Sequence, residues 1–437
     1  MLLIYCHQIT SRSKYAFKLI FSDMLQLPYT ITTSLEDYQT YLGPKLCYSK
    51  RRIDQTPWIY CSGLLFEKGI KYQEIRTFSW NNIKAFFKAP ASADFPFDVF
   101  AASFYLVSRY EEYLPHIKDQ HQRFIAEQSL AYQEAFLDKP VVDYYALGVF
   151  AFLKAKYPEL PDHKRTYKYE PTIDIDNAYA IRNKGFERII AGLFQNLFKA
   201  DFPAFKERLM VTLHLKRDPY DTYEYQLKMI KKYRLKVIYF ILLGDYAQYD
   251  KNVAATNKNL QSLIKFLADY AEIGIHPSYA SNKQPSKMLK EISRLSIILH
   301  REIKKSRQHF LKLSLPETYQ RLIDADITDD YTMGYPSQLG YRASTCTPFF
   351  FYDLDLETET SLKIHPFAVM DGTLKDYLNL PNEKVLKSVK PFIEEARKVA
   401  GTFVTLWHNE TFAENQRWKG WQKIYEDITK EALRENH

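Results

Sequence analysis

Short apolar runs alternate with longer amphipathic stretches over the second part of the chain. Residues 237–243 (VIYFILL) form a continuous apolar run, which is typical of a strand buried on both faces. Residues 286–304 and 383–399 repeat apolar positions every three or four residues, which predicts amphipathic helices. Alternating strands and helices predict a parallel sheet or barrel with helices outside. The same patterns predict strands at 172–176, 272–276, 309–313, 362–367 and 402–407, and helices at 224–233, 260–270 and 316–324.

The first 165 residues mix strand-like runs with helices. Residues 1–6 predict a strand, because this apolar run is too short for the core of a signal peptide. Residues 98–113 have apolar positions at helical spacing, which predicts a helix that ends in an acidic turn. The polar stretch 158–164 (PELPDHK) carries two prolines and is the predicted linker. We therefore expect an α/β protein with an accessory domain over residues 1–165 and a second domain over residues 166–437.

Composition narrows the classes of function. The 437 residues include 34 Tyr, 29 Phe and 5 Trp but only 13 Gly, which argues against a glycine-rich nucleotide loop and allows aromatic-lined clefts. The net charge of +8 comes from scattered helical lysines and arginines without a nucleic-acid motif, so no nucleic-acid partner is expected. With neither an 18-residue apolar run nor a signal-peptide core, we expect a cytoplasmic protein without an integral membrane segment.

Carboxylates and histidines stand at the ends of three predicted strands. Asp174 and Asp176 alternate along one strand and therefore project from the same face. Two neighbouring carboxylates repel each other, which favours a bound cation or a shared proton between them. His276 and His408 each follow a later apolar strand, where a neutral imidazole is a good metal ligand. Because catalytic groups of parallel barrels gather at the carboxyl ends of strands, we expect these four side chains to share one site.

In their order along the chain, these motifs resemble the polysaccharide deacetylases, carbohydrate esterase family 4. The matching motifs are T-x-D-x-D around Asp174, G-x-H ending at His276 and L-x-H ending at His408. Two further phrases, 109–113 (RYEEY) and 340–343 (GYRA), resemble a bacterial branch of that family. The resemblance implies a distorted (β/α) barrel of the polysaccharide deacetylase type, preceded by a smaller α/β domain.

The resemblance also implies a role for each motif residue. Asp174 would be the general base and His408 the general acid. Asp176 and His276 would bind a divalent metal, for which Zn²⁺ is the expected ion. The second histidine of the family motif is missing, because Ala280 stands in its place.

Two positions in the expected site stay open. Water, His309 or His365 are the alternatives that would complete the metal site. The arginine that orients the base has three candidates, Arg307, Lys312 and Arg342. We prefer Arg342, because the small residues that follow it would let its side chain reach inward. The side chains expected to contact substrate are Tyr279, Arg307, His309, Asp330, His365 and Trp407.

The implied function is metal-dependent removal of acetyl groups from N- or O-acetylated sugars or polysaccharide intermediates. Two alternatives stay open. Ala280 favours a degraded enzyme that binds carbohydrate without hydrolysis. The lack of an export signal gives weight to a hydrolase of the same fold that acts on a small acylated metabolite. The sequence does not indicate the oligomeric state.

Overall fold

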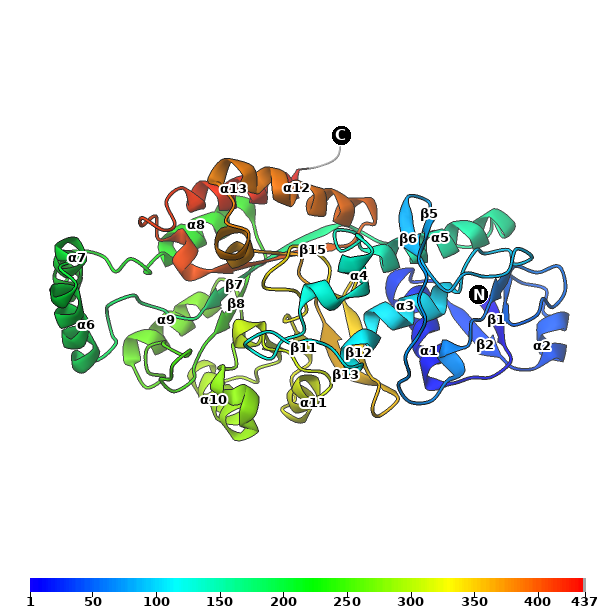
Figure 1. Cartoon of the computed structure of the whole chain (residues 1–437), viewed down its shortest axis with the longest axis horizontal. Helices are drawn as coiled ribbons and strands as arrows, with labels where there is room; N and C mark the ends of the chain where they lie inside the picture. The colour runs from blue at the N-terminus through cyan, green and yellow to red at the C-terminus, as the bar shows by residue number, and fades with distance from the viewer. Residues whose placement is uncertain (435–437) are drawn as a thin grey trace.

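The computed structural model describes residues 1–434, apart from the side chain of Phe186. A four-stranded sheet near the N-terminus and a nine-stranded sheet in the rest of the chain lie side by side along the long axis of the molecule (Figure 1). Within the described residues, none of the helices combines the length and the apolar character that crossing a bilayer requires.

The N-terminal sheet is parallel throughout. It contains the strand predicted at residues 1–6, which is β1 (Leu2–Cys6). Helices pack around it, and the hairpin β5 (Phe78–Trp80) and β6 (Ile83–Ala85) lies beside them. The strand order is β2 (Tyr29–Thr32), β1 (Leu2–Cys6), β3 (Lys45–Ser49) and β4 (Trp58–Tyr60). The helices are α1 (Ser11–Phe17), α2 (Leu35–Thr40), α3 (Val99–Val107), α4 (Leu130–Gln133) and α5 (Val141–Lys156).

The helix expected over 98–113 is shorter than the pattern indicates. It ends at Val107, and Arg109 adopts a left-handed backbone conformation with φ of 53°. Residues 110–113 then form a separate short 3₁₀ turn. Glu112 of this turn accepts two hydrogen bonds from Arg342, a residue of the second part of the chain.

Eight of the nine strands in the larger sheet run parallel, and β12 pairs antiparallel at one edge. The last strand, β15, lies beside β7, as the last and first strands of a barrel do. Within residues 1–434 no ladder joins β13 to β14, so the structure shows a mostly parallel α/β sheet and does not show closure of a barrel. The strand order is β12 (Phe349–Asp353), β13 (Thr358–Ile364), β11 (Asp329–Asp330), β10 (Lys305–Ser306), β9 (Glu272–Ile275), β8 (Ile238–Ile241), β7 (Lys168–Ile175), β15 (Thr402–His408) and β14 (Val369–Met370).

One predicted strand is wrong. Residues 309–311 form a short 3₁₀ turn in which Phe310 has φ of 60°, and the strand of this region is β10, which begins four residues earlier than expected. The apolar character of this segment reflects burial of Leu311 and Leu313 in a turn, which hydropathy alone does not distinguish from a strand.

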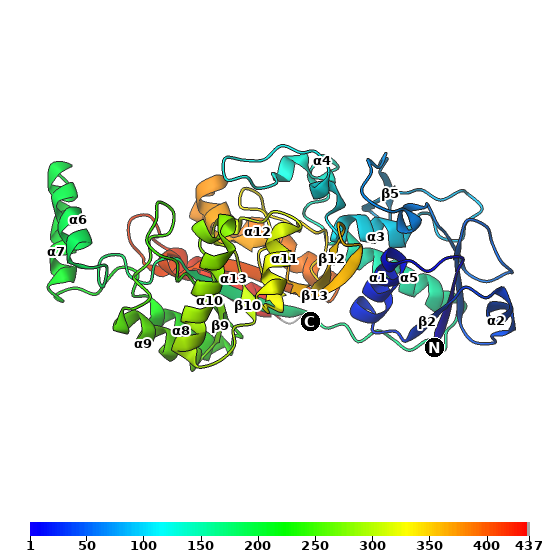
Figure 2. The same ribbon diagram turned by 90° about the horizontal axis from the view of Figure 1, so that it is seen from below.

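Helices surround the larger sheet, as Figures 1 and 2 show. The hairpin of α6 and α7 instead stands apart from the body in both views. The helices of this part are α6 (Phe186–Phe198), α7 (Phe202–Thr212), α8 (Tyr223–Tyr233), α9 (Lys258–Ala268), α10 (Pro285–Leu299), α11 (Glu317–Asp324), α12 (Asn382–Lys398) and α13 (Trp421–Leu433).

The two sheets are connected by side chains that cross from α1 to the β12–β13 hairpin. Arg12 pairs with Glu357 and is almost completely buried. The hydroxyl of Tyr15 donates to the carbonyl oxygen of Phe350 at 2.6 Å. The N-terminal part therefore packs on the edge of the larger sheet and is joined to it by side-chain contacts as well as by the linker.

Candidate metal centre

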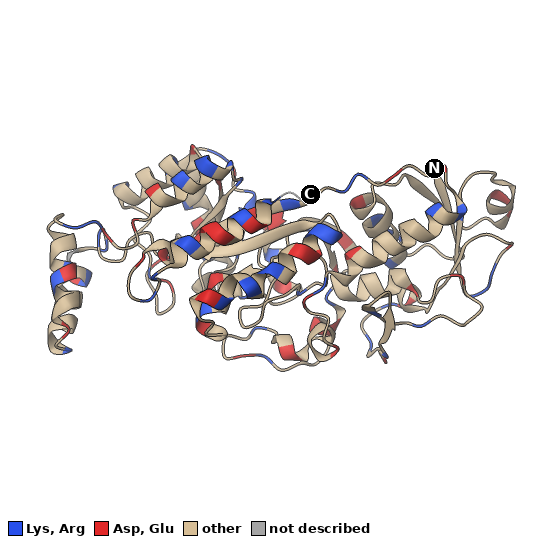
Figure 3. Cartoon of the chain, turned by 90° about the horizontal axis from the view of Figure 1, so that it is seen from above, with Lys and Arg blue, Asp and Glu red and all other residues tan. Residues whose placement is uncertain are grey.

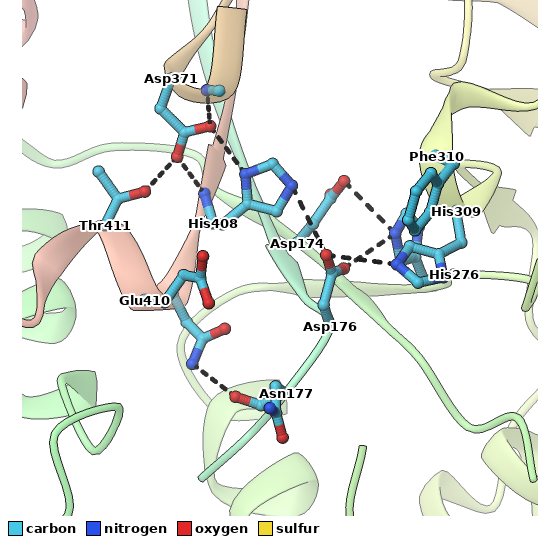
Figure 4. A network of polar contacts seen from close by, with 12 residues as sticks. Asp174, Asp176, Asn177, His276, His309, Phe310, Asp371, His408, Glu410 and Thr411 are labelled. Carbon is cyan, nitrogen blue, oxygen red and sulfur yellow. Dashed lines mark hydrogen bonds and ion pairs between the residues drawn. The ribbon is translucent and has the colours of Figure 1, made fainter. Parts of the chain in front are cut away.

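The carboxyl ends of four strands bring acidic and histidine side chains together (Figure 4). Asp174 lies in β7 and Asp176 directly follows it, while His408 ends the neighbouring strand β15 at the level of Asp174. His276 follows β9, and His309 follows β10. Parallel strands end at the same edge of a sheet, which is why positions so far apart in the sequence meet here.

Three histidines direct their Nε2 atoms at the carboxylate of Asp176. Nε2 of His276 lies 3.1 Å from Oδ1 of Asp176, and Nε2 of His309 lies 3.4 Å from Oδ2. Nε2 of His408 lies 3.7 Å from the same Oδ2 atom. Asp176, His276 and His309 each offer a ligand atom, and these atoms lie within 4.8 Å of one another.

The other ring nitrogen of each histidine is held by an acceptor. Nδ1 of His276 lies 2.6 Å from the carbonyl oxygen of Arg307. Nδ1 of His309 lies 2.9 Å from Oδ1 of Asp250, and Nδ1 of His408 lies 2.7 Å from Oδ1 of Asp371. Such partners orient metal-binding histidines and set their tautomers.

The donor set fits a divalent cation. The carbonyl of Arg307 can only accept, so the proton of neutral His276 sits on Nδ1 and Nε2 presents a lone pair to Asp176. A lone pair facing a carboxylate is repulsive unless a cation or proton lies between them. Oδ1 of Asp176 is also buried without a hydrogen bond of good geometry. Imidazole and carboxylate ligands are those that Zn²⁺ prefers, so these residues fit such an ion.

Charge coupling within this cluster shifts several pKa values. Burial raises the pKa of Asp176, but His309, His276 and His408 outweigh this and hold it well below its ordinary range. Burial lowers the pKa of His309, but Asp176 and Asp250 raise it overall to about 9. Burial likewise lowers the pKa of His408, but Asp371 raises it well above its usual value. Without a metal, the raised pKa values of His309 and His408 therefore favour the protonated form of both rings beside the carboxylates.

The arginine beside the first aspartate is Arg307. Its Nη1 lies 2.8 Å from Oδ1 of Asp174, and its Nε donates to the carbonyl of Tyr331 at 3.0 Å. The guanidinium is fully buried and lies over the ring of Phe240, with 4.6 Å to the ring centroid. Of the three candidates from the sequence, the structure brings Arg307 to the carboxylates.

The preference for Arg342 is corrected by its contacts. Arg342 donates from Nε and Nη2 to the carboxylate of Glu112, at 2.9 and 2.6 Å, and is 1% exposed. The small residues that follow it are themselves buried. Glu112 belongs to the N-terminal part, so this pairing depends on tertiary packing. Lys312 also lies elsewhere, with its Nζ 4.2 Å from the ring centroid of Tyr279.

A cavity of about 280 Å³ opens over the cluster, between β7, β15 and the loop after β10. It contains Asp174, Asp176, His276, His309 and His408 of the sequence prediction. Its other lining side chains include Arg123, Phe310, Tyr377, Glu410, Arg417 and Trp418.

Several residues expected to contact substrate lie outside this cavity. Trp407 is fully buried in the core, where its indole N–H donates to the hydroxyl of Thr405 at 3.0 Å. Asp330 is buried and accepts a hydrogen bond from the hydroxyl of Ser306 at 2.6 Å. Side-chain alternation explains Trp407: in β15 its ring points to the face opposite His408.

Two further candidates have other neighbours. His365 stacks on Tyr331 with 4.2 Å between ring centroids, and its Nε2 lies 2.7 Å from Oδ1 of Asp329. It therefore does not join the cluster, and His309 is the histidine that stands where a third ligand is needed. Tyr279 packs against Tyr249, with ring centroids 4.5 Å apart.

Sequence reasoning missed Asp250 and Asp371. Asp371 directly follows β14, so an acid after an apolar pair was the available signal, as it was for Asp176. Asp250 lies in the long loop after β8, where no pattern marks it. The backbone N–H groups of Tyr279 and Ala280 donate to Asp250 at 2.8 and 3.1 Å. Ala280 thus supports the acceptor of His309 through its main chain.

The N-terminal part contributes Arg123 to the cavity wall. Its Nη1 donates to the carbonyl of Phe310 at 2.6 Å, and its Nε donates to Asp119 at 2.7 Å. His121 beside it lies 3.3 Å from the hydroxyl of Tyr279 through Nδ1. The accessory part therefore touches the loop that carries His309.

Comparison with known proteins gives weak similarities. Residues 2–158 match the model of a family of unknown function, DUF7033. No curated protein matches the chain. A Mycobacterium smegmatis protein, provisionally assigned as a polysaccharide deacetylase, is similar with a TM-score of 0.39 and 12% identity, over 62% of this chain and 86% of that chain.

Two other solved structures are similar at comparable levels. A Pseudomonas aeruginosa PAO1 protein with the same provisional assignment has a TM-score of 0.36 and 11% identity, over 62% of this chain and 91% of its own. A CE4 family pseudoenzyme from Bacillus anthracis has a TM-score of 0.30 and 9% identity, over 61% and 62%. All three scores lie below 0.5, so these similarities establish neither the activity nor the substrate of this chain.

Proposed function

We propose that this protein is a divalent-metal-dependent hydrolase that removes acetyl groups from N- or O-acetylated sugars or polysaccharide intermediates. The observation that carries the proposal is the convergence of Nε2 of His276 and Nε2 of His309 on the carboxylate of Asp176, at 3.1 and 3.4 Å, which is a donor set that fits a divalent cation. Asp174 with its arginine and His408 with its aspartate flank that position. Metal ligands beside one paired carboxylate and one paired histidine are the parts that hydrolysis of an acetyl group requires.

The cavity suits a sugar. Its volume of about 280 Å³ is near the lower end of the range for small-molecule sites. Trp418, Tyr377 and Phe310 line it, and flat rings of this kind pack on the apolar faces of sugar rings. The same wall carries the polar groups of Glu410 and Arg417, which can bind hydroxyls.

Asp174 is proposed as the general base. Asp176, His276 and His309 would hold the divalent ion, which when bound would polarise an acyl carbonyl and lower the pKa of a bound water. Arg307 holds Asp174 in position by a buried charge-assisted hydrogen bond at 2.8 Å. The second carboxylate oxygen, Oδ2, lies 3.7 Å from Nε2 of His276 and so faces the metal position.

His408 is proposed as the general acid. Asp371 accepts from Nδ1 and from the backbone N–H of His408, both at 2.7 Å, which holds the ring in one orientation. The raised pKa of His408 keeps a proton available on Nε2. That proton can pass to the leaving nitrogen or oxygen, which otherwise departs poorly.

The test uses the full chain loaded with Zn²⁺ and a panel of acetylated sugars, from N-acetylglucosamine to its oligomers and nucleotide-linked form. Acetate release is measured for the wild type, Asp174→Asn and the control Asp269→Asn, whose side chain is exposed at the end of α9. Release by the wild type and the control, and its loss in Asp174→Asn, supports the proposal. Equal release from all three proteins removes Asp174 from the mechanism.

A second candidate function is carbohydrate binding without hydrolysis. The observation that favours it is Ala280, where the deacetylase motif has a metal ligand. The two candidates differ in metal dependence. Glycan binding that is unchanged by a chelator, without acetate release from any member of the panel, would establish the second.

A further inference from the structure

The insertion between β7 and α8 carries a helical hairpin that leaves the body of the protein. Helices α6 and α7 pack on each other and stand away from the other elements in both views (Figures 1 and 2). The insertion begins directly after Asp176. Its two ends are fastened together, because the carboxylate of Asp218 accepts from the backbone N–H groups of Ala180, Ile181 and Arg182, each at 2.8 Å.

Both helices expose an apolar stripe. On α6, Phe194 is 56% exposed and Phe198 is 88% exposed, and they are four residues apart on one face. Phe202 and Leu209 on α7, and Leu213 directly after it, are exposed at spacings of seven and four residues, which again fall on one face. Large apolar groups gathered on one projecting element mark an interaction surface.

The charge of the hairpin favours an anionic partner. Residues 186–217 contain six Lys or Arg and three Asp or Glu. Lys199 lies at the turn between the helices and Lys206 lies on α7, both exposed beside the apolar stripe. Figure 3 shows the hairpin as mostly uncharged, with a few basic and acidic positions along it. Amphipathic helices with aromatic and aliphatic residues on one face and Lys or Arg beside it are typical of membrane interfaces.

We propose that the α6–α7 hairpin docks this protein on an anionic lipid surface. Phe198 and Phe202, at the turn, enter the boundary between headgroups and acyl chains, while Lys199 and Lys206 contact acidic headgroups. Docking of a second copy by the same face would bring two positively charged hairpins together, whereas anionic lipid neutralises them. Each helix is too short to span a bilayer, since the 13 residues of α6 extend only about 20 Å. The hairpin therefore lies in the interface.

The test is sedimentation of the full chain with lipid vesicles in 0.1 M salt, where the Debye length is about 10 Å. Vesicles of phosphatidylcholine with about one third phosphatidylserine are compared with phosphatidylcholine alone, a contrast that isolates the electrostatic contribution. We expect roughly tenfold more protein bound to the anionic vesicles, and a fall in binding when salt is raised.

Two variants and a control separate the contributions. F198D/F202D removes the apolar side chains at the tip of the hairpin, and K199E/K206E reverses two of its positive charges. All four side chains are exposed, so neither double variant changes the core. L42D changes a fully exposed leucine of the N-terminal part and serves as the control. Each double variant should lose most vesicle binding, about tenfold or more, while the control binds as the wild type does.

Several results would overturn the proposal. One is wild-type protein that stays in the supernatant with anionic vesicles. Another is F198D/F202D binding as strongly as the control. A third is a dimer in light scattering that F198D/F202D abolishes without any effect on vesicle binding, which would assign this face to a second copy of the chain.

Discussion

Nη1 of Arg307 lies 2.8 Å from Oδ1 of Asp174, and neither side chain is more than 2% exposed. A buried carboxylate without a cation partner is strongly unfavourable, so this pair fixes the position of Asp174 at the end of β7. Arg307 belongs to the loop that follows β10, and its carbonyl holds His276 at the same time. One residue thus orients both the proposed base and a proposed metal ligand.

Arg307→Lys should lower acetate release by about 100-fold. Lysine keeps the charge but loses the planar fork that bonds Asp174 and the carbonyl of Tyr331 together. The matched variant Arg342→Lys changes the same residue type at the Glu112 pair, outside the cavity, and should leave kcat within about threefold. Steady-state kinetics of both, with thermal unfolding as a check on folding, decide the matter. An equal loss of kcat in both variants would contradict the assignment of Arg307.

His309→Gln should weaken Zn²⁺ binding by about 100-fold or more, because it removes one of the three candidate ligands. His365→Gln is the control, since that ring stacks on Tyr331 outside the cluster and should leave the affinity unchanged. Titration calorimetry and metal content of the dialysed proteins provide the measurement. Loss of metal in the His365 variant, with retention in the His309 variant, would reverse the assignment.

Asp250→Asn should weaken metal binding by about 10- to 100-fold without changing its stoichiometry. The carboxylate does not belong to the ligand set, but it holds Nδ1 of His309 and so orients that ligand. Asn can still accept a hydrogen bond, although without the negative charge that makes the imidazole a stronger ligand. The affinity of the variant is measured by competition with a chelating dye. An affinity equal to that of the wild type would show that Asp250 has no part in holding His309.

Asp371→Asn should lower kcat by about 10- to 100-fold with little change in KM or in metal content. The change removes the charge that raises the pKa of His408, and the proposed acid then carries its proton less readily. Asp371 contacts neither the proposed ligands nor Asp174, so the binding of metal and of substrate should be retained. Initial rates over a range of substrate concentration separate kcat from KM. A selective rise in KM would assign Asp371 to substrate binding instead.

Glu112 makes a pH-dependent contribution to stability. Burial raises the pKa of Glu112, but Arg342 and Arg109 outweigh this and lower it from 4.5 to about 2. Stability from this group is therefore complete above pH 4.5 and is lost as the pH falls toward 2; the whole contribution is on the order of 3 kcal/mol. The free energies of unfolding of the wild type and Glu112→Gln should differ most at neutral pH, and the difference should shrink as the pH falls from 4.5 toward 2. A constant difference across that range would exclude the linkage.

The central strands of the larger sheet, β7, β8, β9 and β15, were predictable because they are largely buried. The run around Val237–Leu243 is apolar without interruption, and β8 occupies its centre at Ile238–Ile241. Gly274 of the G-x-H motif has a packing reason as well, since a Cβ there would lie 2.8 Å from the carbonyl oxygen of Lys305. The turn at 309–311 was not predictable, because burial of a turn and burial of a strand give the same hydropathy.

By itself, the sequence determined the alternation of strands and helices and the acids and histidines that end the strands, because both are local patterns with the periods of secondary structure. Tertiary structure alone decided which of those groups meet. It brought Arg307 rather than Arg342 to Asp174, and it paired His408 with Asp371. It also placed His309 beside Asp176, in a chain that has Ala280 where the expected motif has its second histidine. These pairings join residues that are far apart in the chain, and they depend on strand order and loop direction, which no spacing along the sequence encodes.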